Sequence, residues 1–193
     1  MSRILITILV ACSFLAFFGT SEAAGANARV LIKTNKGDIT VELYPDKAPV
    51  TVKNFLAYVD AKFYDSLIFH RVIKGFMIQG GGLTADFSTR PAKSPIKNEA
   101  GNGLKNDRGT LAMARSGEVD SATCQFFINH VNNDFLNHTD NTPEGFGYCV
   151  FGQVVSGLEV VDAIATTPTM TVHGMEDVPR ETVTIISVRR VEN

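Results

Sequence analysis

The chain has 193 residues, of which 45% are hydrophobic and 20% are charged, and its formal net charge is −2. Sixteen glycines and seven prolines make it neither a disordered nor a fibrous composition. A near-neutral chain lacks the positive charge on which nucleic-acid binding depends, so we expect no nucleic-acid partner. This length suits one large domain or two small ones.

The leading segment has the pattern of an export signal. Arg3 precedes fifteen uncharged residues, 4–18, and small residues follow them. A basic start, an apolar stretch and a small-residue end are typical of a secretory signal peptide. A stable membrane span needs about 20 apolar residues, so none is expected. We predict a signal peptide over residues 1–28 and one domain over 29–193. Cleavage sites are offered after Ala23, Ala26 and Ala28.

Cys12 offers an alternative to simple cleavage, because Leu9-Val10-Ala11-Cys12 has the look of a lipoprotein processing site. In that case the cysteine would be acylated and would anchor the protein to a membrane. However, only eight apolar residues precede Cys12 and a further apolar stretch follows it, whereas a lipoprotein linker is polar. The preferred interpretation is that Cys12 leaves with the signal peptide.

The first elements after the leader are two predicted hairpins and a helix. Apolar residues alternate with polar ones on both sides of a glycine turn, which predicts strands over 29–34 and 39–44. Pro49 suits the first turn of a helix. The apolar face of that helix consists of Val52, Phe55, Leu56 and Val59. A second hairpin is predicted over 67–73 and 76–79, with Gly80, Gly81 and Gly82 ending it.

The second half of the chain begins with an irregular segment, residues 83–108. A loop of that length in a compact domain is usually functional or mobile. A second helix is predicted from Gly157, with Leu158, Val161 and Ile164 on its apolar face. The remaining strands are predicted at 110–115, 124–128, 148–155 and 182–188.

Eight strands and two helices without βαβ alternation indicate a mainly β fold. A closed eight-stranded antiparallel barrel is favoured, because closure removes the exposed strand edges that invite aggregation. The interior of a barrel of this size is filled by side chains. The functional site is therefore expected on the outer wall or the rim.

The motifs of several common enzyme classes do not occur in the sequence. It contains no nucleophile elbow, no phosphate-binding loop and no dinucleotide-binding fingerprint. Its four histidines show no metal-ligand spacing, so no metal or cofactor is expected. A Cys124 nucleophile paired with His130 or His138 is disfavoured, because nothing local activates the thiol.

One long motif carries the strongest functional signal. It reads Phe69-His70-Arg71-Val72-Ile73-Lys74-Gly75-Phe76-Met77-Ile78-Gln79-Gly80-Gly81. This resembles the signature of the cyclophilins, which are peptidyl-prolyl cis-trans isomerases. The resemblance continues through 109–115, 125–128 and 150–154 and covers residues 29–191. It implies an eight-stranded antiparallel barrel capped by two helices.

The leader and the segment around Tyr148 resemble the bacterial periplasmic branch of that family. The resemblance therefore implies a periplasmic enzyme without a cofactor, expected to be a monomer. Its partners would be proline-containing polypeptides, including unfolded exported proteins. The rival hypothesis is a binding module that holds such chains without turnover, and a weaker one is a structural secreted barrel.

The chemistry of prolyl isomerisation explains the residue types. The barrier of about 18–20 kcal/mol arises from the partial double bond of the amide, so catalysis needs stabilisation of the twisted amide and no proton transfer. A guanidinium can donate to the prolyl nitrogen once twisting has freed its lone pair. Arg71 is the predicted donor. His70 is interpreted as structural, because this mechanism has no role for it.

The resemblance assigns the other site residues. Gln79 would orient Arg71 and the substrate carbonyl, and the backbone of Ala114 and Arg115 would hydrogen-bond the peptide. The substrate-binding residues are Phe76, Met77, Ala114, Arg115, Gln125, Phe127, Phe135, Leu136 and Tyr148. The pattern alone would place the apolar residues in the core and Arg71 on a solvated face.

Three positions depart from the better-known eukaryotic pattern. Phe135 stands where a tryptophan is common, Tyr148 where a histidine is usual, and Arg115 where an asparagine is usual. The indole N–H that helps to hold cyclosporin is therefore missing, and weak cyclosporin binding is expected. Cys124 and Cys149 are expected to be free thiols, although a bridge is possible if their strands are neighbours.

Overall fold

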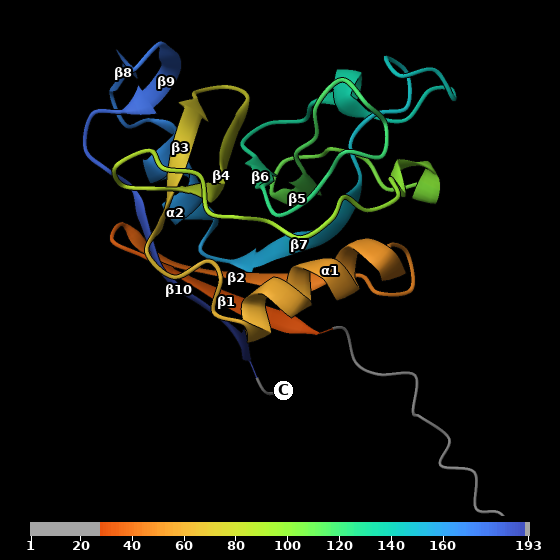
Figure 1. Ribbon diagram of the computed structural model, residues 1–193, viewed down its shortest axis with the longest axis horizontal. Helices are drawn as coiled ribbons and strands as arrows, with labels where there is room; N and C mark the ends of the chain where they lie inside the picture. Colours follow the sequence, from red (N-terminus) through yellow and green to blue (C-terminus); the bar gives the residue numbers. More distant parts are fainter. Residues whose placement is uncertain (1–27, 192–193) are drawn as a thin grey trace, which may run out of the picture.

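The structure, a computed structural model, describes residues 28–191, and its centre is a closed barrel of eight strands (Figure 1). The barrel strands are β1 (Arg29–Thr34), β2 (Gly37–Leu43), β3 (Leu67–Ile73), β4 (Met77–Thr84), β5 (Thr110–Met113), β6 (Phe126–Asn129), β7 (Val150–Ser156) and β10 (Thr184–Val191). They close in the order β1-β10-β3-β4-β6-β5-β7-β2, and every pairing is antiparallel. The predicted mainly β, closed eight-stranded antiparallel barrel is confirmed.

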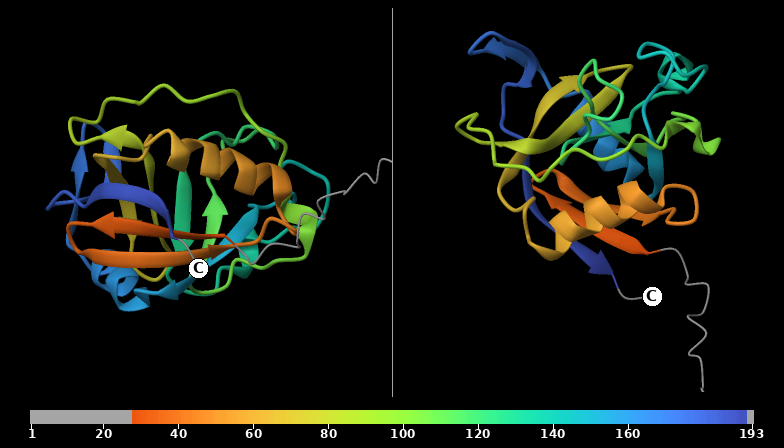
Figure 2. Two further views of the ribbon diagram at one scale, coloured as in Figure 1. Left: turned by 90° about the horizontal axis from the view of Figure 1, so that it is seen from below. Right: turned by 45° about the vertical axis from the view of Figure 1, so that its right-hand side comes forward.

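Two helices, α1 (Pro49–Asp60) and α2 (Leu158–Ala165), lie on opposite sides of the barrel (Figure 2). Pro49 occupies the first turn of α1, as the sequence predicts. The Glu99 carboxylate caps this helix by accepting hydrogen bonds from the backbone N–H groups of Val50 (3.1 Å) and Thr51 (2.8 Å). A carboxylate at this position satisfies orphan donors and complements the helix dipole.

The structure contains a second hairpin sheet that the sequence did not predict. Strands β8 (Thr169–Val172) and β9 (Met175–Pro179) pair only with each other and project beyond the barrel next to β3 (Figure 1). Most of their side chains are exposed or half-exposed, and Val178 is the buried anchor. Because a projecting arm buries little apolar surface, it leaves no apolar period in the sequence.

The prediction that Gly80, Gly81 and Gly82 end the second hairpin is wrong, because all three lie inside β4. A Cβ atom on Gly80 would come 2.8 Å from the carbonyl oxygen of Ile68. Gly81 has a φ of +86°, and a Cβ there would lie 2.9 Å from the Phe126 ring. Glycine inside a strand thus marks a close approach of backbone and ring rather than a turn.

An aromatic cluster fills the barrel interior. The Phe55 ring lies within 5.2–5.7 Å, between centroids, of the rings of Tyr64, Phe126 and Phe151. Phe126 also meets Tyr64 and Phe69 edge-on. These side chains are fully or almost fully buried, so the barrel has a packed core and no internal channel.

A smaller apolar cluster lies outside the barrel wall. It consists of Met77, Ala112, Phe127, Leu136 and Val150. On β6 the chain alternates, so that Phe126 and Ile128 enter the main core while Phe127 joins the outer cluster. This outer apolar cluster lies where a site on the outer wall of the barrel is expected.

Candidate functional site

Nine of the eleven predicted site residues line one cavity of about 290 Å³ on the outer face. They are Arg71, Phe76, Met77, Gln79, Ala114, Arg115, Phe127, Leu136 and Tyr148. They come from β3, the turn that follows it, β4, β6, the segment after β5 and the segment before β7, together with the 3₁₀ helix η2 (Asp134–Leu136). A cavity at the lower end of ligand-pocket sizes suits a single small ring.

The apolar half of this cavity is preformed. Met77 and Phe127 lie outside the barrel but are only 2% and 4% exposed. Both are buried because they belong to the outer apolar cluster. The Tyr148 ring meets Phe127 edge-on at 5.8 Å between centroids. Phe135 does not line the cavity; it is 73% exposed and stacks on Phe76 at 5.5 Å. It therefore forms the outer rim.

Two arginines line the cavity, and Arg71 is the one that a barrel strand carries. The next residue on β3, Val72, enters the barrel core, so the side chain of Arg71 lies on the outer face, and it is 44% exposed. Gln79 is its cross-strand partner on β4. The Gln79 amide donates to Oε1 of Gln125 at 3.0 Å. The nearest carboxylate to Arg71 is that of Asp177 on β9, with Oδ2 lying 3.9 Å from Nε.

Asp177 does not line the cavity, but it is the acidic neighbour of Arg71, which the sequence analysis did not indicate. It lies on the projecting arm with a φ of +60°. Its carboxylate faces the Nε of Arg71, which leaves the two terminal nitrogens of the guanidinium for a ligand. At 3.9 Å the contact is an ion pair without a hydrogen bond, so Asp177 attracts the guanidinium without fixing its position.

Replacing Asp177 by asparagine is expected to lower kcat about two- to fivefold, the effect of losing one exposed ion pair. KM should change little, because the hypothesis from the sequence has Arg71 donate to the twisted amide and not to the planar, bound peptide. Kinetics at low and high salt would measure this, since salt screens only the wild-type pair. Glu176→Gln, which alters the adjacent exposed carboxylate, is the matched control and should behave like wild type. Equal kcat values for wild type and Asp177→Asn would contradict the role.

Gln125 lies in a second, adjoining recess of about 260 Å³, which shares Gln79, Ala114 and Arg115 with the first. The backbone N–H of Ala114 donates to the Gln125 carbonyl oxygen at 3.0 Å. Its N–H is therefore already engaged, and the predicted backbone contact with a peptide is left to the Ala114 carbonyl. The two recesses together form one continuous face along β5 and β6.

The side chain of Arg115 has a role that the sequence did not indicate. Its Nε donates to the Gly147 carbonyl at 2.9 Å and its Nη2 to the Pro143 carbonyl at 2.8 Å. The guanidinium carbon lies 4.9 Å from the centroid of the Tyr148 ring. Arg115 thus joins the loop after β5 to the loop before β7 and fixes Tyr148 at the mouth of the cavity.

His70 is buried beside the site but does not line the cavity. Burial lowers the pKa of His70 to about 4, and the positive charge of Arg71 acts in the same direction. Its Nδ1 has no hydrogen-bond partner among the described residues. A ring that stays neutral and sealed from the cavity agrees with a structural role.

Stability is expected to fall on acidification because of His70. The unfolded chain binds a proton at the ordinary pKa of 6.5, whereas the folded chain resists it down to about 4. The stabilisation is therefore complete above pH 6.5 and is lost as the pH falls from 6.5 to 4, with a total of about 3 kcal/mol. Urea unfolding at pH 7.5 and 4.5 would measure this loss. His70→Leu should unfold with less pH dependence over this interval; an unchanged dependence would contradict the assignment.

Cys124 and Cys149 are both buried free thiols, as expected. They precede β6 and β7, which are separated in the barrel by β5, so the strands are not neighbours. Burial raises the pKa of both thiols, that of Cys149 to about 11. A nucleophilic role for Cys124 is therefore disfavoured by its burial as well as by the sequence.

Within residues 28–191 no group of three or more acidic, histidine or cysteine side chains is arranged to hold a metal ion. No helix in the same range is long and apolar enough to cross a membrane. The predicted signal peptide and Cys12 lie outside the described residues, apart from Ala28, whose carbonyl oxygen accepts from Leu43 N–H at 2.8 Å.

Comparisons with known proteins agree with the barrel and its outer cavity. The model of the family described as cyclophilin type peptidyl-prolyl cis-trans isomerase/CLD matches residues 29–190. Peptidyl-prolyl cis-trans isomerase B of Escherichia coli strain K12 is 56% identical over 159 residues, which cover 82% of this chain and 97% of the relative. Peptidyl-prolyl cis-trans isomerase A of Dickeya dadantii is 45% identical over 192 residues, covering 100% of both chains.

Solved structures give the same result. A cyclophilin type peptidyl-prolyl cis-trans isomerase of Cryptosporidium parvum superposes with a TM-score of 0.71 at 30% identity, covering 86% of this chain and 99% of the other. A second crystal structure of that protein was obtained in the presence of the dipeptide Ala-Pro. The fold and the cavity thus define a peptidyl-prolyl cis-trans isomerase. The chain belongs to the cyclophilin family, and its substrates are proline-containing peptides.

Proposed function

We propose that this isomerase accelerates rotation of X-Pro bonds in exported, folding proteins, with Arg71 stabilising the twisted amide and the apolar cavity holding the proline ring. The observation that supports this most directly is that Arg71 and a preformed apolar recess line a single cavity. In this cavity Arg71 can interact with the charge that develops on the prolyl nitrogen, and the apolar side chains can hold the proline ring.

In this mechanism Arg71 discriminates between two states of the same nitrogen. The planar amide delocalises its lone pair, so the ground state offers no acceptor. Rotation localises the lone pair on a pyramidal nitrogen, to which a guanidinium N–H can donate. A charge-assisted hydrogen bond contributes about 1.5–3 kcal/mol, and a tenfold rate gain needs about 1.4 kcal/mol. Desolvation beside the apolar wall strengthens this bond further.

The remaining site residues would hold the substrate. Phe76, Met77, Phe127 and Leu136 would surround the proline ring, with Phe135 and Tyr148 at the rim. Gln79 would orient Arg71 and the carbonyl before proline, and Gln125 would lie alongside the preceding residues in the adjoining recess. Ala114 and Arg115 would meet the peptide backbone. Because these contacts read the proline and the backbone, the clients would have little else in common.

The cellular setting is part of the same proposal. The exported form, with a signal peptide removed on the way to the periplasm, is supported by the relative from Dickeya dadantii, which aligns with this chain over its whole length, leader included. Cleavage after Ala23 or Ala26 would keep Ala28, whose carbonyl oxygen pairs with β2, whereas cleavage after Ala28 would remove this bond. Mass spectrometry of the protein purified from the periplasm would give the mature N-terminus. A lipidated N-terminus at Cys12 would contradict the soluble form.

The enzyme should act as a monomer and bind cyclosporin weakly. The rim residue Phe135 has no indole N–H to donate, and Arg115 is already engaged with three loop carbonyls and one neighbouring carbonyl around Tyr148. We expect isomerase activity to persist at cyclosporin concentrations that are well above the enzyme concentration. Inhibition measured in the same peptide assay would test this, and a nanomolar inhibition constant would contradict it.

The experiment that tests the proposed function is NMR exchange spectroscopy on an Ala-Pro peptide. Catalytic amounts of the wild-type protein should bring cis/trans exchange from tens of seconds into the NMR exchange window. A binding module would broaden and shift the peptide resonances in a saturable way without producing exchange cross-peaks between the two isomers. This second outcome would contradict catalysis and would support a binding module that holds prolyl chains without turnover.

A further inference from the structure

The turn that carries Phe76 has a geometry that needs support. Residues 73–76 form a β-turn in which Phe76 N–H donates to the Ile73 carbonyl at 3.0 Å. Gly75 has a φ of +75°, whereas Lys74 does not have a positive φ, and this combination identifies a type II turn. Types I and II differ by rotation of the central peptide plane, here that of Lys74–Gly75. A type II turn does not follow the twist of hairpin strands, so the strands alone do not select it.

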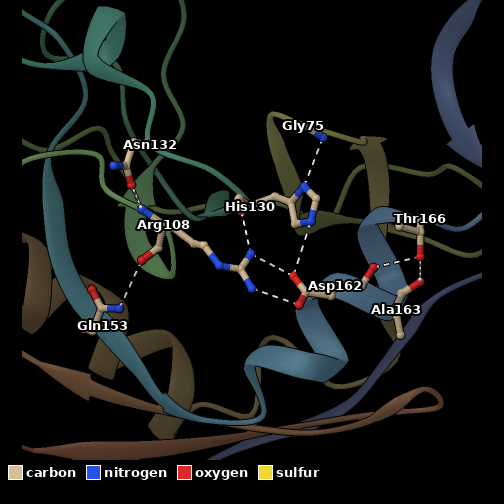
Figure 3. Close-up of polar contacts among 8 residues, drawn as sticks. All are labelled: Gly75, Arg108, His130, Asn132, Gln153, Asp162, Ala163 and Thr166. Atoms are coloured by element: carbon tan, nitrogen blue, oxygen red, sulfur yellow. Dashed lines mark hydrogen bonds and ion pairs between the residues drawn. The ribbon is translucent and has the colours of Figure 1, made fainter.

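His130 contacts this peptide plane from outside the hairpin. Its Nδ1 accepts a hydrogen bond from the Gly75 N–H at 3.0 Å (Figure 3). In a type I turn this N–H would point in the opposite direction and the bond would be lost. The backbone N–H of His130 also donates to the Phe76 carbonyl at 2.9 Å, and Asn133 Nδ2 donates to the same oxygen at 2.9 Å. The turn is thus held on both sides of Phe76.

Asp162 on α2 keeps the His130 ring in the state that this contact needs. Its Oδ1 lies 3.3 Å from Nε2, so the proton of the neutral ring belongs on Nε2 and the lone pair on Nδ1. Arg108 holds this carboxylate with two hydrogen bonds of 2.8 Å and donates to the His130 carbonyl at 2.7 Å (Figure 3). The hydrogen bonds from Arg108 also keep the pKa of Asp162 below its ordinary value.

We propose that His130 is a positioning residue of the isomerase: its ring nitrogen locks the Lys74–Gly75 peptide in the type II orientation and so seats Phe76 in the wall of the proline cavity. His130 does not line the cavity and acts through Phe76. The inference rests on the proposed function, in which Phe76 grips the proline ring. Through Asp162, which contacts the His130 ring and pairs with Arg108, this side of the cavity is connected to α2.

The test compares four variants of the full chain with wild type. His130→Ala should raise KM for an Ala-Pro peptide about three- to tenfold with kcat nearly unchanged, the consequence of losing one hydrogen bond at the wall. His130→Asn keeps an acceptor close to the position of Nδ1 and should restore KM to within about twofold of wild type. His173→Ala removes an exposed histidine at the tip of the β8–β9 hairpin and should leave both constants unchanged. Phe76→Ala is the reference for loss of the wall itself and should raise KM at least as much as His130→Ala.

NMR gives a readout that a general loss of stability would not produce. The Gly75 amide proton should lose its hydrogen-bonded shift and exchange faster with solvent in His130→Ala, and both changes should be reversed in His130→Asn. In wild type, the imidazole ¹⁵N shifts should show the proton on Nε2. Because the Gly75 amide is at the surface and Phe76 retains its other hydrogen bonds, the His130→Ala variant is expected to fold.

Two outcomes overturn the inference and are distinguishable from failure of the proposed function. A wild-type KM for His130→Ala, while Phe76→Ala raises KM, would show that the turn needs no lock. An Asn variant as impaired as the Ala variant would show that the acceptor is not what matters. A wild-type KM for Phe76→Ala would instead overturn the role given to the proline wall and, with it, the reason for positioning it.

Discussion

Arg71→Ala is expected to lower kcat/KM for prolyl isomerisation by about 100- to 1000-fold, the cost typical of removing one preorganised donor from a transition state. Most of the loss should appear in kcat, because the planar ground state offers no lone pair to Arg71 and loses little when the guanidinium is removed. Arg71 is half-exposed on an outward-facing strand position, so its removal should not disturb the core. Exchange spectroscopy on an Ala-Pro peptide gives both constants.

Two further substitutions make this test specific. Arg71→Lys keeps the charge but loses the planar fork, and it should recover only a small part of the activity. Arg190→Ala removes a surface arginine that pairs with Asp60 on α1 and should leave the activity unchanged. A wild-type kcat for Arg71→Ala would contradict the twisted-amide mechanism, even if the substitution weakened peptide binding.

Phe126→Ala is expected to destabilise the protein by about 3–5 kcal/mol, the range for removing a buried phenylalanine. Its ring is fully buried and meets Phe55, Tyr64 and Phe69 edge-on, at centroid distances of 5.4–6.0 Å. Such ring pairs add to the burial term, and the close approach of Gly81 leaves the cavity no easy way to collapse. Urea unfolding at pH 7.5 would measure the change.

Two other phenylalanines serve as controls for this prediction. Phe135→Ala truncates a ring that is 73% exposed and should change the free energy of unfolding by less than about 0.5 kcal/mol. Phe127→Ala, one residue along the same strand, removes part of the outer cluster and should mainly raise KM. If Phe126→Ala unfolds no more easily than Phe135→Ala, the assignment of the two faces of β6 is wrong.

The barrel could be predicted because most of its strands leave a clear pattern. Val30 and Ile32 on β1 and Ile39 and Val41 on β2 alternate with more exposed residues, and their hairpin is paired as expected. β6 is different, because all four of its residues are buried: Phe126 and Ile128 in the core, Phe127 in the outer cluster, and Asn129 among polar side chains. Where both faces are covered, the period of two disappears, and only the family resemblance separated Phe127 from Phe126.

The roles that could not be predicted from the sequence depend on contacts between residues that are far apart in the chain. Asp177 reaches Arg71 from an arm that buries little, and Arg115 is fixed by carbonyls about 30 residues away. Neither kind of contact has a local pattern. The three glycines of β4 were misjudged for the opposite reason, since glycine usually marks a turn and only the packed rings reveal why the strand needs it.

The burial of both thiols affects how the enzyme can react with partly folded polypeptides that contain cysteines. Polypeptides that fold outside the cytoplasm expose cysteines that exchange disulfides readily with any accessible thiolate. Cys124 and Cys149 lie 3% exposed beneath the barrel wall, and burial keeps both protonated at neutral pH. Burial therefore protects both thiols from exchange with the cysteines of a partly folded substrate, so we expect catalysis on such a chain to leave no mixed disulfide.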